Sequence, residues 1–156
     1  MDRPGLLDRL AAFPARLAAA AHGAAEPAAG EWSVSEVVRH LVAVEDEIWH
    51  ARLDQLAQAA GSQARPHWRH TEPRPRVLSD PGLAAALTTF AEHRAATVSR
   101  LANLDEPGWA RTGSHETYGL LDVEGLVRLA VDHDDEHLAG LVALASDPPS
   151  TTASAT

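Results

Sequence analysis

Residues 122–145 read DVEGLVRLAVDHDDEHLAGLVALA, and this stretch predicts one long amphipathic helix. Steps of three and four residues place seven side chains on a single helical face: Val123, Leu126, Ala130, His133, His137, Leu141 and Leu144. Asp122 precedes this stripe and can cap the helix, which is expected to run to about Ala145. Two histidines therefore lie where the helix should face the protein core.

His133 and His137 are four residues apart, so their side chains lie on the same side of the helix, roughly 6 Å from each other. That spacing lets both imidazoles reach one metal ion. A buried polar ring without a partner costs on the order of 1 to 3 kcal/mol, so an adjacent pair requires an explanation. His40, on the edge of an earlier helical stripe, can point into the same interior. The residues favour one divalent ion bound by these three histidines, and a core histidine satisfied by a neighbouring carboxylate is the alternative for each.

Two helices are expected before the middle of the chain. The first carries the stripe Leu6, Leu10, Phe13 and Leu17. Pro14 should kink or restart it, because a proline inside a helix costs about 3 kcal/mol. Ser33 and Glu36 match a capping box at the start of the second helix, with Trp32 packing on Val37. This second helix is the longest and should continue until Gly61.

Residues 61–79 contain three prolines and no periodicity, which predicts a long crossover that Trp68 could hold in place. A third helix should begin at Ser79 or Asp80, before Pro81. Residues 105–121 are expected to form a second long loop. The chain is therefore expected to be all-α, an up-down four-helix bundle over residues 1–146 with a long crossover between helices two and three. Residues 147–156 form an expected disordered tail.

Composition excludes several classes of function. The chain has 13 basic and 22 acidic residues, a net charge of −9, which argues against nucleic acid and anionic membranes as partners. It has no cysteine, so disulfides, thiolate metal sites and cysteine nucleophiles are excluded. It shows no secretory leader and no run of about 20 apolar residues, so a cytoplasmic location is expected. A small-molecule substrate is the partner class that remains.

Two stretches resemble the DinB/YfiT-like bundles. Residues 31–49, EWSVSEVVRHLVAVEDEIW, resemble that family's Trp, helix start and His-Leu pair, and residues 132–141, DHDDEHLAGL, resemble its His-Asp-x-x-His. The resemblance implies a four-helix bundle with a long second connection, frequently dimeric, so that a homodimer is an open expectation. It also implies a three-histidine metal site, which falls here on His40, His133 and His137. Members include metal-dependent transferases that act on low-molecular-weight thiols such as bacillithiol and mycothiol, and many members have no assigned activity.

Three neutral imidazoles leave open coordination positions, which is typical of catalytic metal sites. One divalent ion per chain is expected. Zinc is the first choice and nickel the other option, because nitrogen ligands alone do not select one of these metals over the other. Asp134 and Glu45 are the candidate catalytic residues, expected to orient the imidazoles or to move protons, and the alternative is that each is a solvated helix carboxylate.

Three functions stay open at this point. The first is a metal-dependent S-transferase that uses a low-molecular-weight thiol as a cofactor. The second is a metal-dependent hydrolase, because HDDEH nearly matches H-E-x-x-H with Asp134 at the position of the general base. The third is a non-enzymatic metal-binding or stress-response bundle. A closed metal site without a substrate pocket would indicate this function.

Overall fold

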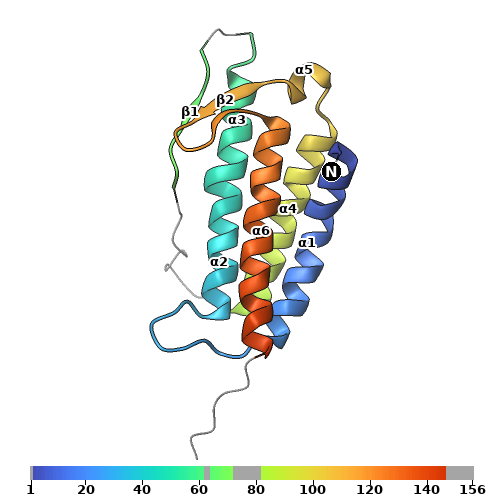
Figure 1. The fold of residues 1–156 in the computed structure, drawn as a ribbon. Helices are drawn as coiled ribbons and strands as arrows, with labels where there is room; N and C mark the ends of the chain where they lie inside the picture. Colours follow the sequence, from blue (N-terminus) through green and yellow to red (C-terminus); the bar gives the residue numbers. More distant parts are fainter. Residues whose placement is uncertain (1, 62–63, 72–81, 147–156) are drawn as a thin grey trace, which may run out of the picture.

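Four rods of helix make up the body of the protein in a computed structural model that describes residues 2–61, 64–71 and 82–146 (Figure 1). The first, third and fourth rods are α1 (Arg3–Gly23), α4 (Leu83–Ala102) and α6 (Val123–Ser146). The second consists of α2 (Val34–Val44), a π-helical segment η1 (Glu45–His50) and α3 (Ala51–Gln58). Helix α1 packs on α4 and α6, and α2 packs on α4. The all-α four-helix bundle is confirmed.

The long crossover determines the direction of the third rod. Helix α4 begins at the same end of the bundle as α2 and runs in the same direction (Figure 1). The ion pairs between these rods agree, because Glu45 pairs with Arg94 and, further along both rods, Asp54 pairs with Arg100. The start of the third helix expected at residues 79–81 lies outside the described residues, and so does the tail at 147–156. Helix α4 is described from Leu83, after Gly82.

Two of the helices begin at the capping residues that the sequence predicts. Ser33 and Glu36 form both bonds of the capping box, as expected. Asp122 accepts a hydrogen bond from the backbone N–H of Gly125 at 2.7 Å, which confirms its capping role. Helix α1 is a single helix through Pro14, so the expected restart there is wrong. The apolar stripe predicted for α1 is nevertheless buried. Its Phe13 ring packs edge-on against the Phe90 ring, with 5.7 Å between ring centroids.

A π-helical segment interrupts the second rod in its middle. In such a segment the backbone bonds span five residues, so the helix gains a residue and its following faces rotate. The apolar stripe shows the same insertion, because Ile48 and Leu53 are five residues apart and both are buried. Glu45 and Trp49 of this segment lie in the interior.

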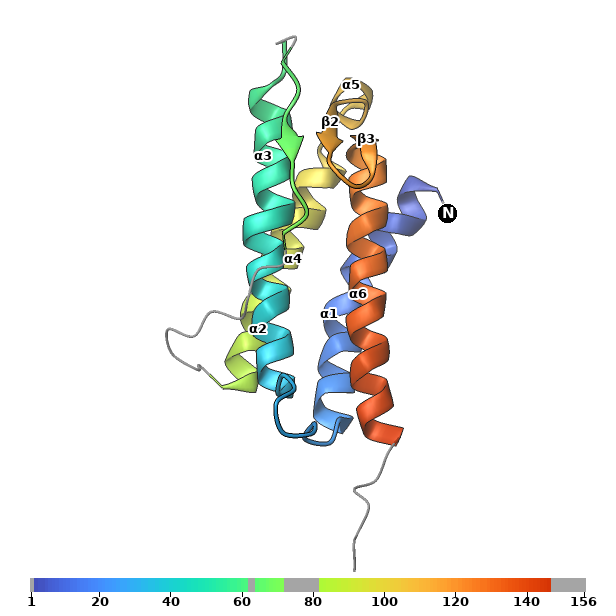
Figure 2. The same ribbon diagram turned by 60° about the vertical axis from the view of Figure 1, so that its left-hand side comes forward.

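A small sheet closes one end of the bundle, so the expected long loop at 105–121 is wrong. After a short helix α5 (Glu106–Trp109), strands β2 (Thr112–His115) and β3 (Gly119–Asp122) form an antiparallel hairpin, and β1 (His67–Trp68) pairs with β2 in parallel. Figure 2 shows β1 alongside α3 and the hairpin beside the start of α6. Gly113 lets the Trp68 ring approach, because a Cβ there would lie 2.3 Å from the ring.

Trp68 holds the end of the crossover against α3, as expected. Its side chain is buried, and its Nε1–H donates to Gln55 Oε1 at 2.7 Å. Among the described residues, no helix combines the length and the apolar character needed to cross a membrane.

Candidate metal centre

The structure brings His40, His133 and His137 together at the interface of α2 and α6. Each offers a ring nitrogen, and the three nitrogens lie within 4.8 Å of one another. The Nε2 atoms of His133 and His137 are 3.2 Å apart. Two nitrogen ligands bound to one zinc ion at 2.0–2.1 Å in tetrahedral geometry would lie roughly 3.3 Å apart. The donor set therefore fits a divalent ion.

Local structure explains why the three rings converge. The four-residue spacing on α6 stacks His133 and His137 one turn apart, with ring centroids 4.5 Å from each other. His40 is buried on α2, and its centroid lies 4.8 Å from that of His137. Trp32, expected as a staple on Val37, lies 4.9 Å from the His40 ring. The two helices thus supply the three ligands without any loop residue.

The site keeps His133 neutral. Burial lowers the pKa of His133 to about 3, and the neighbouring His137, His40 and Arg94 add to that shift. A neutral imidazole is the form that donates a lone pair to a metal ion. The Nδ1 atom of His133 is buried and has no hydrogen-bond partner in the described part of the chain.

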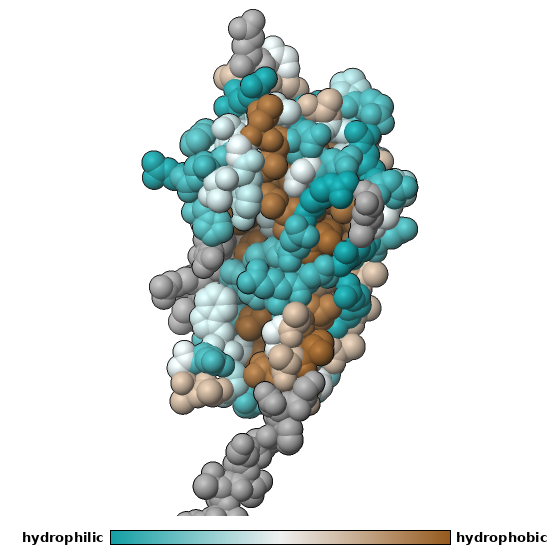
Figure 3. Space-filling view, viewed as in Figure 1, coloured by the Kyte–Doolittle hydropathy of each residue, from teal (hydrophilic) through white to brown (hydrophobic). Residues whose placement is uncertain are grey.

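A pocket of about 470 Å³ opens onto the three histidines. Its apolar lining includes Val44, Ile48, Trp49 and Leu129. Its polar lining includes Arg52, His70, His115 and Tyr118, with Asp132 and Glu136 from α6. Figure 3 shows the molecule from the side of Figure 1, with hydrophobic residues along the middle that a band of hydrophilic residues interrupts. A volume of this size is within the usual range for small-molecule sites.

Comparison with known proteins agrees with this arrangement. The family model of the DinB superfamily matches residues 6–141, which include all three histidines and most of each of the four rods. The chain belongs to the DinB superfamily. No curated protein sequence matches it.

The DinB-superfamily chain is similar to the solved structure of YfiT from Bacillus subtilis. The TM-score is 0.73 at 18% identity, over 94% of this chain and 89% of that one. YfiT is described as a probable metal-dependent hydrolase with an unusual four-helix bundle topology. At this identity the likeness shows the fold.

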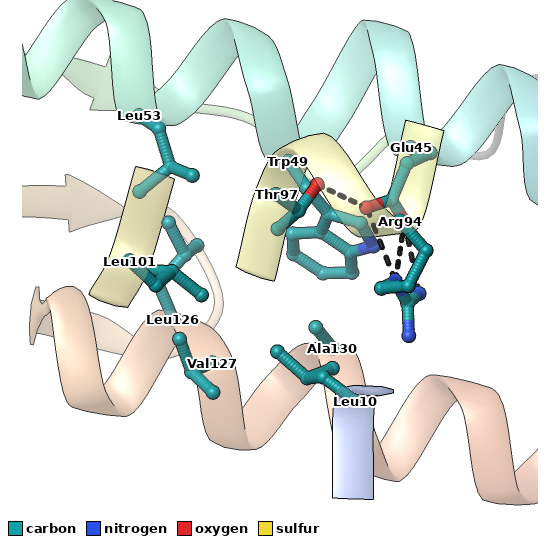
Figure 4. A pocket seen from close by; sticks show the side chains of 10 residues that line it. All are labelled: Leu10, Glu45, Trp49, Leu53, Arg94, Thr97, Leu101, Leu126, Val127 and Ala130. Atoms are coloured by element: carbon teal, nitrogen blue, oxygen red, sulfur yellow. Dashed lines mark hydrogen bonds and ion pairs between the residues drawn. The ribbon is translucent and has the colours of Figure 1, made fainter. Parts of the chain in front are cut away.

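Asp134 and Glu45 contact an arginine rather than the imidazoles. Arg94 of α4 donates to Asp134 at 2.6 and 3.1 Å and to Glu45 at 2.9 to 3.2 Å, and all three side chains are almost fully buried. Glu45 also accepts a hydrogen bond from the Thr97 hydroxyl (Figure 4). The alternative of two solvated helix carboxylates is therefore wrong. The expected hydrogen bonds to the histidines are replaced by an internal ion-pair network.

This network has more negative than positive groups. Burial raises the pKa of Asp134 to about 6, while the hydrogen bonds from Arg94 oppose that shift and the nearby Glu45 carboxylate adds to it. Together the two carboxylates raise the pKa of Arg94 above its ordinary value despite its burial. A cavity of about 10 Å³ lies beside the network, lined also by Trp49 and Leu10 (Figure 4).

Several residues that line the pocket of this DinB-superfamily protein were not predicted from the sequence. His70 and His115 line the pocket, and neither is among the site residues predicted from the sequence. Arg52 was not considered, yet it lies in register with buried Ile48 and Leu56, four residues from each. An arginine within an apolar stripe was the available signal.

Two other histidines lie where the second rod packs against α4: His50 belongs to the second rod and His93 to α4. His50 shares a hydrogen bond with the Thr97 hydroxyl at 2.7 Å, and His93 lies 2.7 Å from an Asp46 carboxylate oxygen. His50 is half-buried. Neither lines the pocket at the three-histidine site.

Proposed function

We propose that the protein holds one divalent ion with His40, His133 and His137 and transfers a low-molecular-weight thiol, of the bacillithiol or mycothiol type, to an electrophilic small molecule. The observation that carries this proposal is the opening of the three-histidine cluster onto a pocket of about 470 Å³. A closed structural metal site would have no such pocket. Zinc is the expected ion, with nickel as the other option.

The choice of a thiol as nucleophile rests on the position of Asp134. When bound, a divalent ion at this site would lower the pKa of a coordinated thiol or water. A thiol starts from a pKa of about 8.5, so a moderate shift is enough and no general base is required. Asp134 stands at the position of the general base in H-E-x-x-H, but inside the bundle its carboxylate accepts hydrogen bonds from Arg94. The chain has no cysteine, so the sulfur has to arrive with a cofactor.

A transfer assay tests this function. The ion-loaded protein is mixed with bacillithiol, mycothiol or glutathione and with a chlorinated aromatic compound. The sulfur forms a bond to the carbon that carries chlorine, chloride leaves, and the thiol proton passes to solvent. We expect a rate that depends on the ion and is lost in His137→Ala but kept in His22→Ala, a change on exposed surface. No rate above background with any thiol would overturn the proposal.

Hydrolysis is the second candidate, favoured by the description of YfiT as a probable metal-dependent hydrolase. The same protein samples, assayed on a panel of esters and amides, separate the two. Ion-dependent cleavage in that panel without thiol transfer would replace the transferase with a hydrolase. Activity in neither panel would favour a non-enzymatic metal-binding protein.

A further inference from the structure

Among the residues that the structure describes, Arg52 of α3 is a buried cation without a carboxylate partner. Its side chain is 7% exposed. Its Nη2 donates to the backbone carbonyl of Arg69 at 3.0 Å, and its guanidinium lies 5.8 Å from the Trp49 ring and 5.4 Å from the Trp68 ring. Within residues 2–61, 64–71 and 82–146, no acidic side chain forms an ion pair with it. Burial lowers the pKa of Arg52.

This setting is unusual because the protein has a net charge of −9. The other deeply buried arginine, Arg94, binds two carboxylates. A buried charge without a counter-ion is unfavourable, and native proteins generally pair such groups or use them to bind ligands. Arg52 lines the same pocket as the three histidines, so its remaining donors can be reached from that pocket.

His115 provides a second donor in the same wall. The backbone N–H groups of Thr117 and Tyr118 both donate to its Nδ1 atom, at 3.1 and 3.4 Å. A ring nitrogen that accepts hydrogen bonds carries no proton, so the proton of the neutral ring is on Nε2. Burial lowers the pKa of His115, and the nearby Arg52 and His70 lower it further, so the ring stays neutral. The turn between β2 and β3 thus fixes His115 as a hydrogen-bond donor.

Charge is distributed unevenly along the pocket. Asp132 and Glu136 of α6 lie next to the metal ligands in sequence and line the pocket with them. Arg52 is twelve residues after His40, so its Cα lies roughly 18 Å further along the same rod. In metal-free protein, an anionic group in the pocket would therefore be repelled near the histidines and attracted at the Arg52 end.

We propose that Arg52 and His115 form a recognition site for a carboxylate group, so that the protein takes elongated small molecules with a carboxylate at one end and the reacting group at the other. A planar guanidinium matches the two oxygens of a carboxylate, and the neutral His115 adds a donor without a second charge. One positive charge suits a monoanion better than a phosphate dianion. The apolar wall formed by Ile48, Trp49 and Leu129 suits the chain or ring between the two ends. This inference names the substrate class of the function proposed above and rests on it for the reacting end only.

Binding to metal-free protein tests the carboxylate site without any catalysis. The probe is 3-phenylpropionate, compared by calorimetry with its neutral analogue 3-phenylpropionamide and with phenyl phosphate. We expect the acid to bind at least about tenfold more tightly than the amide, the usual effect of hydrogen bonds to a charged group. The acid should also shift the Arg52 Nε–H resonance in nitrogen-15 NMR spectra.

Four variants locate the effect. Arg52→Met should abolish the preference for the acid while the protein stays folded, and Arg111→Met, which changes an arginine in a different pocket, should keep it. His115→Leu should reduce the preference in part. His137→Ala removes a metal ligand and should leave the preference intact, so a failed transfer assay with an intact preference would overturn the proposed function alone.

Several results would overturn the carboxylate site itself. They are equal binding of acid and amide, no binding of the acid up to ~10 mM, an unchanged preference in Arg52→Met, and tighter binding of phenyl phosphate than of the acid.

Discussion

Replacing Arg94 by methionine should destabilise the protein strongly, because it leaves two buried carboxylates without their cation. The side chains of Arg94, Glu45 and Asp134 are 2%, 0% and 3% exposed, so water cannot take the place of the arginine. Removing one partner from a buried pair typically costs about 3 to 5 kcal/mol. Here one arginine serves two carboxylates, so we expect a loss of about 4 kcal/mol or more at pH 7.5.

The assay is urea unfolding followed by tryptophan fluorescence, since the chain has four tryptophans. With a urea slope of about 2 kcal/mol per molar, a loss of 4 kcal/mol lowers the midpoint by about 2 M. The matched control is Arg100→Met on the same helix, where an exposed arginine pairs with Asp54. Exposed pairs contribute about 0 to 1 kcal/mol, so the control should lower the midpoint by less than about 0.5 M.

A rescue variant separates the loss of charge pairing from a loss of packing. Adding Glu45→Gln and Asp134→Asn to Arg94→Met removes both unpaired charges and keeps side chains of similar size. More than half of the lost stability should return. Equal midpoints for Arg94→Met and Arg100→Met, or no recovery in the triple variant, would refute the assignment of this cluster as a buried ion-pair network.

Three more outcomes follow from the geometry. His133→Ala and His137→Ala should each abolish tight binding of zinc in calorimetric titrations, whereas His50→Ala, outside the pocket, should bind as the wild type does; equal losses in all three would contradict the ligand assignment. Chelating the ion should lower the melting temperature by roughly 5 to 10 °C, because occupancy at 100 times Kd adds only about 2.7 kcal/mol to a core that exists without it. Unfolding on chelation would instead make the ion structural. Gly113→Ala should cost about 1 to 3 kcal/mol, because its Cβ would lie 2.3 Å from the Trp68 ring, and an unchanged urea midpoint would show that the ring can move aside.

The parts of the fold that sequence could predict are those with a regular period. The stripe on α6 placed His133 and His137 in the core because helical spacing alone determines which side chains share a face. The capping box at Ser33 marked a helix start for a similarly local reason. The π-helical segment was missed, although the five-residue step from Ile48 to Leu53 is its trace in the sequence.

The small sheet and the ion-pair network depend on distant partners, which no local pattern reveals. Strand β2 reads Thr-Gly-Ser-His, without the alternation of apolar residues that identifies a strand, and it exists because β1 and β3 pair with it. The partner of Asp134 comes from another helix. Arg94 was nevertheless visible as a charged residue in an apolar stripe, four residues after Phe90 and seven before Leu101.

The most direct test of the metal centre is X-ray absorption at the zinc edge, on protein prepared without an affinity tag and loaded with one equivalent of zinc. We expect three imidazole nitrogens at about 2.0 to 2.1 Å together with at least one oxygen ligand from solvent, the pattern of an open site. In His137→Ala the imidazole count should fall. A shell with one imidazole or none, or a shell made of carboxylate oxygens, would contradict a metal centre at His40, His133 and His137.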